Sequence, residues 1–142
     1  MPHTQIGVQP VAEVHAELFR RSFSLPGVSN RATVVSIPGA RALWLDPSIE
    51  LAHPEVIVAG REFTHIHPDG SMHLSLPVER AREAIDSGWA EPHPIARQIG
   101  MEGMVLVYTP RTFEELEVLW ELVLDAYCYV TGRPRPAADP VA

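Results

Sequence analysis

The chain has 142 residues, 46% of them hydrophobic, which suits one globular domain with its own core. Its formal net charge of −7 comes without any basic run. This excludes nucleic-acid binding, because phosphate contacts need clustered Lys and Arg. The single cysteine, Cys128, excludes an internal disulfide and a cysteine-based zinc site, and we expect a buried, inert thiol there.

We expect neither a signal peptide nor a membrane-spanning segment in this sequence. No basic segment followed by an apolar run stands at the N-terminus, and no apolar stretch approaches the ~20 residues that span a membrane. We therefore expect a cytoplasmic protein with no membrane partner. Residues 1–132 are predicted to form a single domain, and the Pro/Ala-rich residues 133–142 a disordered tail.

The first part of the chain predicts a helix followed by a hairpin. Apolar residues recur with helical spacing from Val11 to Phe19, and Pro26-Gly27 ends the element, so we expect a helix over 11–23. Two β-rich runs, 33–37 and 41–45, flank Pro38-Gly39, which suits a type II turn because glycine supplies the positive φ.

The second part adds two helices and a strand, whose limits are marked by proline, glycine and a capping box. They are a helix over 77–87 followed by Gly88, a loop over 89–94, a strand over 104–108, and a helix that starts at the capping box 112–115 and closes at Gly132. The chain therefore predicts an α+β domain: a small, mainly antiparallel sheet of two hairpins plus a further strand, with helices packed on one face.

A second hairpin is predicted over residues 62–76, which alternate on both sides of a turn at Pro68-Asp69-Gly70. Pro and Asp suit the centre of a type I turn, and glycine suits the left-handed residue that follows. With this turn, His65 pairs with His73 and His67 pairs with Ser71. Directly paired side chains share a face with Cβ atoms ~5 Å apart, so the hairpin presents three imidazoles together.

Three neighbouring imidazoles can do either of two kinds of chemistry. His65, His67 and His73 could hold a divalent metal ion such as zinc or iron, with an open position for substrate. Alternatively, a histidine there could act as a general base, because its pKa lies near neutrality. The third reading is an exposed polar face whose histidines only hydrogen-bond one another.

The remaining candidates have simple structural readings. His93 lies between two prolines, and the sequence alone does not bring it to the hairpin. His15 and His53 are expected at the surface, and Asp69 in the turn. Tyr108 and Arg111 flank the end of the predicted strand 104–108, where each could line a pocket or make a structural hydrogen bond. Trp44, Trp89 and Trp120 are expected in the core or in a pocket wall.

Taken together, these motifs resemble the fungal-luciferase-like domain, which occurs in the luciferases of bioluminescent fungi and in many small bacterial and archaeal proteins of unknown function. The resemblance extends over 32–130 and rests on the His-x-His pair at 65–67, Pro-Asp-Gly-Ser-Met-His at 68–73, Gly-Trp-Ala-Glu-Pro-His at 88–93, the strand 105–108 with Thr-Pro-Arg to 111, and the Glu-rich final helix. Residues that match the motif are His65, His67, Ser71, His73 and His93, with Gly88, Trp89, Tyr108 and Arg111 in the flanking pattern.

The resemblance implies an enzyme. The fungal enzymes oxidise a hydroxylated pyrone, 3-hydroxyhispidin, with dioxygen, release light and carbon dioxide, and are regarded as needing no organic cofactor. When it is carried over to this sequence, the resemblance implies catalytic roles for the four histidines His65, His67, His73 and His93. It also implies substrate-binding roles for Ser71, Trp89, Tyr108 and Arg111.

We therefore expect a small-molecule enzyme, of oxygenase type by resemblance, acting on an enol or pyrone-like substrate. The alternatives that use the same residues are a metal-dependent hydrolase or lyase, and a non-catalytic module that binds a metal or a small molecule. The oligomeric state stays open, with a homodimer among the alternatives.

Overall fold

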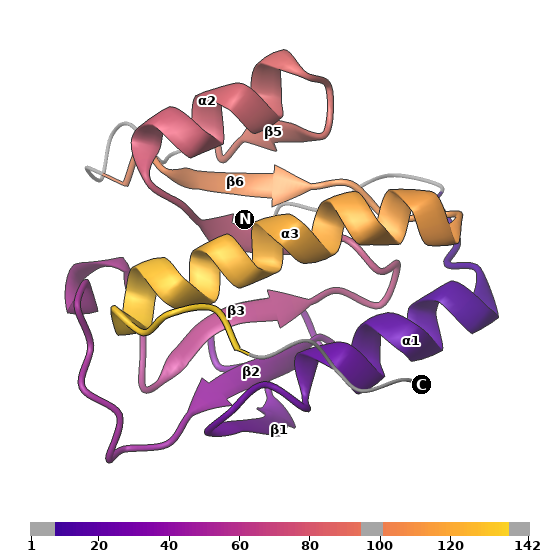
Figure 1. Ribbon diagram of the computed structural model, residues 1–142. Coiled ribbons are helices and arrows are strands. Elements are labelled where there is room, and N and C mark those ends of the chain that lie inside the picture. Colours follow the sequence, from indigo (N-terminus) through magenta and orange to yellow (C-terminus); the bar gives the residue numbers. More distant parts are fainter. Residues whose placement is uncertain (1–7, 95–100, 137–142) are drawn as a thin grey trace.

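The computed structural model of the protein describes residues 8–94 and 101–136 (Figure 1). In chain order its elements are α1 (Ala12–Ser22), β1 (Val28–Ala32), β2 (Arg41–Leu45), the 3-10 helix η1 (Pro54–Val56), β3 (Glu62–Ile66), β4 (Met72–Ser75), α2 (Val78–Asp86), β5 (Ala90–Pro92), β6 (Met104–Val107) and α3 (Phe113–Thr131). Within these residues the strands form one sheet in the order β1-β2-β3-β4-β6-β5, and every neighbouring pair is antiparallel. The predicted α+β fold with a mainly antiparallel sheet is confirmed.

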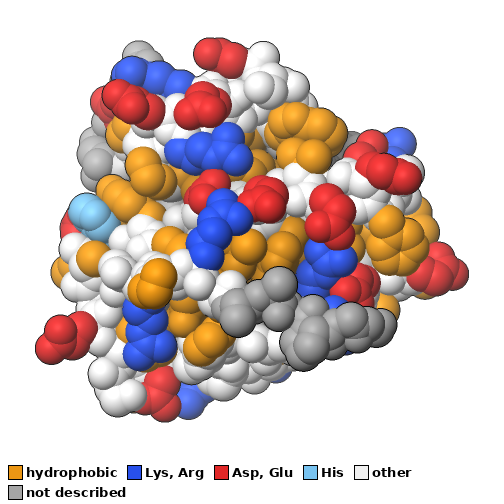
Figure 2. All heavy atoms as spheres, viewed as in Figure 1, with side chains coloured by type: hydrophobic (Ala, Val, Ile, Leu, Met, Phe, Trp, Pro, Cys, Tyr) orange, Lys and Arg blue, Asp and Glu red, His pale blue; other side chains and the backbone are white. Residues whose placement is uncertain are grey.

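Two helices, α1 and α3, lie side by side across one face of the sheet (Figure 1). Seen from this side, acidic and basic side chains are interspersed with apolar ones and there is little histidine (Figure 2). The mixed charges agree with an acidic composition that is spread over the chain rather than gathered into one patch.

The hydrophobic core lies between these helices and the sheet, because alternate strand residues point toward them. Met72 and Leu74 of β4 are buried in it, as are Val105 and Val107 of β6. The other face of the same strands carries His73 in β4 and Leu106 in β6, which are direct partners across the ladder. The fold therefore assigns the histidines to the sheet face that α1 and α3 do not cover.

Local sequence signals explain the long C-terminal helix and the second hairpin. Thr112 caps α3 by accepting a hydrogen bond from the backbone N–H of Glu115, and Gly132 ends the helix in the left-handed conformation at φ 71°. In the hairpin, Gly70 has φ 95°, and the backbone of His67 bonds with that of Ser71 as the predicted turn requires.

The prediction of a first strand over 33–37 is wrong. The Pro38-Gly39 turn forms, with Gly39 at φ 92°, but the strand that pairs with β2 is β1, residues 28–32. Residues 33–36 instead form a loop in which Thr33 Oγ1 accepts the backbone N–H groups of Val35 and Ser36. This side-chain hydroxyl competes with the ladder for the backbone donors, so the strand ends at Ala32.

The expected loop over 89–94 is also corrected, because its residues 90–92 form the edge strand β5 against β6. Pro92 is tolerated there because an edge strand leaves one side of its backbone without a ladder partner. The predicted tail 133–142 lies partly outside the described residues. Within them, Arg135 forms ion pairs with Glu121 and Asp125 of α3.

Two smaller expectations also have an outcome in the described part of the chain. No helix there has the length and apolar character that crossing a bilayer requires. Cys128 is half-buried rather than fully buried, and burial raises the pKa of its thiol, which disfavours the reactive thiolate.

Candidate functional site

A row of directly paired side chains crosses the sheet face opposite α1 and α3. The register sets Ala42 beside His65, His65 beside His73, His73 beside Leu106, and Leu106 beside Glu91. The predicted pairing of His65 with His73 is therefore confirmed. The two histidines occupy the middle of the row, where neighbouring strands on both sides limit the access of water.

Four imidazoles gather around this row. His65, His67 and His73 have ring centroids 4.8 to 5.2 Å apart, and His93 lies 5.0 Å from His73. His67 is completely buried and His65 is 6% exposed, whereas His73 and His93 are half-buried. We call these four residues the histidine cluster. It has a buried side, at His65 and His67, and an accessible side, at His73 and His93.

A buried carboxylate bonds to one ring nitrogen of His65. Nδ1 of His65 lies 2.9 Å from Oε2 of Glu62, and Nε2 of the same ring lies 3.2 Å from Nδ1 of His73. Burial alone would raise the pKa of Glu62, but hydrogen bonds from His65, the backbone N–H of Val34 and the hydroxyl of Thr33 together lower it. Glu62 is therefore an ionised carboxylate inside the protein.

His67 is held in a similar way through a hydroxyl. Its Nδ1 lies 2.9 Å from Oγ of Ser71, and that hydroxyl donates to Oδ1 of Asp69 at 2.6 Å. Because the Ser71 proton goes to Asp69, the hydroxyl oxygen accepts from Nδ1–H of His67. His67 therefore carries its lone pair on Nε2.

The donor set of His65, His67 and His73 fits a divalent metal ion. One ligand atom from each lies within 4.8 Å of the other two. Two nitrogens bound to one ion at about 2.1 Å are about 3.0 to 3.4 Å apart, and Nε2 of His65 and Nδ1 of His73 already lie 3.2 Å apart. A separation of 4.8 Å must shorten by roughly 1.4 to 1.8 Å for all three nitrogens to bind one ion. Metal-binding histidines commonly donate their second ring N–H to an oxygen, as His65 and His67 do.

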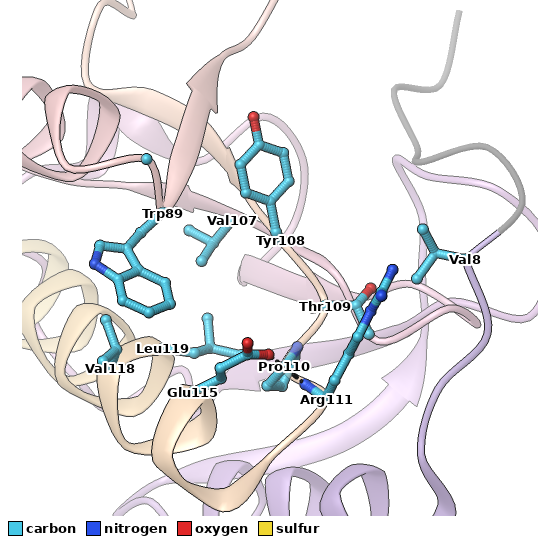
Figure 3. A pocket seen from close by; sticks show the side chains of 11 residues that line it. Val8, Trp89, Val107, Tyr108, Thr109, Pro110, Arg111, Glu115, Val118 and Leu119 are labelled. Atoms are coloured by element: carbon cyan, nitrogen blue, oxygen red, sulfur yellow. Dashed lines mark hydrogen bonds between the residues drawn. The ribbon is translucent and has the colours of Figure 1, made fainter.

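The predicted substrate-binding residues separate into two places. Ser71 is buried in the histidine cluster, whereas Trp89, Tyr108 and Arg111 lie around a pocket of about 350 Å³ between the end of β6 and the first turns of α3 (Figure 3). The pocket also contains apolar side chains, namely Val8, Val107, Pro110, Val118 and Leu119.

Tyr108 connects the two places. It lines the pocket, and its hydroxyl donates to Glu91, which lies in the row that contains His65 and His73. Burial and the nearby Glu91 carboxylate raise the pKa of Tyr108, so the phenol stays protonated at neutral pH.

The other histidines of the described chain lie apart from the cluster. His53 stacks on Tyr129 at 4.0 Å and bonds to Glu55, as a surface residue can. His15 contacts Phe19 with the two rings tilted by 53° and is half-buried next to the Gly70 turn, and burial lowers its pKa against the opposing effect of Asp69. The three tryptophans range from half-buried, Trp44 and Trp120, to exposed, Trp89.

Sequence reasoning missed the carboxylate of Glu62. Strict alternation puts Glu62 and His65, three residues apart, on opposite faces of a strand. The signal that could have found the carboxylate is that a buried histidine needs a partner for its second ring nitrogen, and Glu62 is the nearest acid in the strand.

The fold and the site together define a small α+β domain with a histidine cluster on the sheet face opposite α1 and α3. Residues 60–126, which contain the whole cluster, match the family described as "Luciferase domain". Proteins named "Luciferase" from Armillaria gallica and Armillaria mellea are each 31% identical to this chain over 108 residues, and one from Neonothopanus nambi is 32% identical over the same length. The chain thus contains a fungal-luciferase-like domain, as its motifs predicted.

The chain spans less than half the length of these relatives. The match covers 67% of this chain but 40% of each of these relatives. No significant match was found among solved structures.

Proposed function

We propose that this chain is an enzyme that oxidises a small enol-bearing molecule with dioxygen, and that His65, His67 and His73 bind a divalent metal ion, zinc or iron, in its site. The observation that carries the proposal is the convergence of three imidazole nitrogens within 4.8 Å, two of the rings being held from behind by oxygen atoms. The similarity to proteins named luciferase supports an oxidation.

Each histidine of the cluster then has a role that follows from its exposure. His65 and His67 are buried and suit ligands, because a ligand needs a fixed direction more than access. His73 and His93 are half-buried, and their side of the cluster is the one that a substrate can approach. His93 is therefore the residue we assign to accept the proton of the substrate enol. A bound divalent ion would polarise the enol oxygen and ease the loss of this proton.

The pocket between β6 and α3, which Tyr108 links to the row of the cluster through Glu91, is the place we propose for the non-reacting part of such a substrate. Its apolar wall and the exposed indole of Trp89 provide contact for a flat ring, and the guanidinium of Arg111 provides a positive charge. Ser71 contributes indirectly, because its hydroxyl bonds to His67. The proposed partner is a small molecule.

The first test is the metal content of the purified protein, measured by elemental analysis and by titration of metal-free protein with zinc or iron(II). The second is oxygen uptake with 3-hydroxyhispidin as the probe. We expect uptake by the wild type that falls at least 100-fold in His67→Ala. His53→Ala is the matched control, since it removes a histidine that lies outside the cluster.

Each result distinguishes between the enzyme, the metal-binding module and a protein without a metal. Equal uptake in the wild type and His67→Ala would exclude a catalytic role for the cluster. Stoichiometric metal without uptake would favour the metal-binding module instead. Absence of metal from both the purified and the reconstituted protein would exclude the metal.

A further inference from the structure

We propose that Glu62 is a positioning residue that holds His65 in the tautomer with its proton on Nδ1, so that the lone pair of Nε2 points at His73. The consequence for metal binding rests on the proposed function above, whereas the tautomer itself does not. Neither the family motif nor the strand pattern assigns a role to this carboxylate.

A β-bulge brings Glu62 to this position. Ala42 pairs with His65 and Leu43 with Thr64, but the next residue of β2, Trp44, pairs with Glu62, so Phe63 is an additional residue in β3. This extra residue turns Glu62 onto the face that Trp44, Ala42 and His65 share. The bulge therefore changes a residue that alternation assigns to the core into a neighbour of the cluster.

The carboxylate of Glu62 can only accept hydrogen bonds, and three donors surround it. Oε2 receives Nδ1 of His65 at 2.9 Å and the hydroxyl of Thr33 at 2.8 Å, and Oε1 receives the backbone N–H of Val34 at 2.9 Å. Glu62 is 4% exposed, so water does not replace these contacts. Both oxygens are thus fixed in direction, and the ring nitrogen that faces them must carry a hydrogen.

The position of this hydrogen determines the other side of the ring. A neutral His65 with Nδ1–H has its lone pair on Nε2, which lies 3.2 Å from Nδ1 of His73. In the metal-free protein, Nδ1–H of His73 therefore donates to His65. With a metal present, the same lone pair of His65 is the ligand, and no proton has to leave Nε2.

Replacing the carboxylate by an amide gives a specific result. In Glu62→Gln, the amide oxygen must face the N–H of Val34, because that backbone hydrogen cannot move. The amide NH2 then faces Nδ1 of His65, which can accept only if its proton has moved to Nε2. We therefore expect the variant to exchange the tautomer of His65 and to bind zinc 10- to 100-fold more weakly, as is typical when the partner of a metal-binding histidine is altered.

The experiment is a long-range 1H–15N correlation spectrum of the imidazole rings in metal-free, 15N-labelled full-length protein above the histidine pKa, with the His65 signals identified by their loss in His65→Gln. We expect protonated Nδ1 at His65 in the wild type and protonated Nε2 in Glu62→Gln. The matched control is Glu55→Gln, which makes the same change beside exposed His53, 2.8 Å away, and should leave His65 unchanged. Zinc titrations of the three proteins follow.

Each outcome supports or overturns the assignment. A wild-type His65 protonated at Nε2 overturns it without any variant, so the test holds even if Glu62→Gln folds poorly. An unchanged tautomer in a folded Glu62→Gln also overturns it. Zinc affinity equal to that of the wild type, with the tautomer exchanged, overturns the consequence for metal binding. Absence of zinc binding in the wild type, with the expected tautomers, would instead refute the proposed metal site and leave the role of Glu62 standing.

Discussion

The hydroxyl of Ser71 is the connection between Asp69 and the completely buried ring of His67, and we expect Ser71→Ala to weaken both the fold and the cluster. The substitution removes two hydrogen bonds, from Ser71 Oγ to Asp69 at 2.6 Å and from His67 Nδ1 to Ser71 Oγ at 2.9 Å. Removing one partner of a buried polar group lowers the free energy of unfolding by about 1 to 3 kcal/mol. For a domain of this size, that corresponds to a fall in Tm of roughly 3 to 10 °C.

The same chain contains a control for this substitution. Ser48 donates its backbone N–H and its hydroxyl to Oδ1 of Asp46, as Ser71 does to Asp69, but Ser48 is exposed and the motif contains no histidine. We expect Ser48→Ala to change the free energy of unfolding by less than about 0.5 kcal/mol. Urea denaturation measures both variants.

A second readout concerns the tautomer of His67. Without the Ser71 oxygen, the ring is no longer directed to keep its lone pair on Nε2, so we expect zinc affinity to fall about 10- to 100-fold. Ser48→Ala should leave zinc affinity unchanged. Equal losses of stability in the two serine variants would refute the reasoning, since they would show that the link to His67 contributes nothing beyond the turn.

Two further predictions concern the fold. Gly103→Ala places a Cβ 1.9 Å from the carbonyl oxygen of Leu76, so we expect the free energy of unfolding, measured by urea denaturation, to fall by about 3 kcal/mol or more. Gly88→Ala is the control, because its Cβ meets only an unfavourable φ of 84°, and it should lower the free energy of unfolding by about 1 kcal/mol. A smaller loss for Gly103→Ala than for Gly88→Ala would contradict the contact with Leu76. Burial lowers the pKa of His15, so its protonated form is favoured in the unfolded chain, and the free energy of unfolding should fall as pH drops below the unfolded value of 6.5. His15→Gln should lose this contribution, so a difference between wild type and variant that stays constant from pH 7.5 to 5.5 would contradict the argument.

The second hairpin could be predicted from the sequence because its signals are local. Pro68-Asp69-Gly70 determines the turn, the turn determines the register, and the register places His65 opposite His73. The pairing of the first strand could not be predicted in this way. Residues 33–37 have the composition of a strand, but Thr33 bonds to Glu62, which is 29 residues away in the chain.

The candidate site likewise contains residues that local sequence patterns predict and residues that they do not. The three hairpin histidines follow from alternation, whereas His93 was assigned by resemblance and reaches His73 only because β5 and β6 carry it across the sheet. Glu62 was missed because one additional residue in β3 reverses the direction of its side chain. Short periodic patterns predict which residues share a strand face, but they do not predict an interruption of the strand.

The loop that follows β1 has a consequence for how far the site extends along the chain. The segment that matches the family begins at residue 60, yet Glu62 is held by Thr33 and Val34, and Ala42 of β2 lies beside His65. A fragment that starts at residue 60 would keep every histidine of the cluster and lose the segments that fix one of them. Sequence changes in the loop 33–40 can therefore alter the chemistry of His65 without touching any residue of the matched segment.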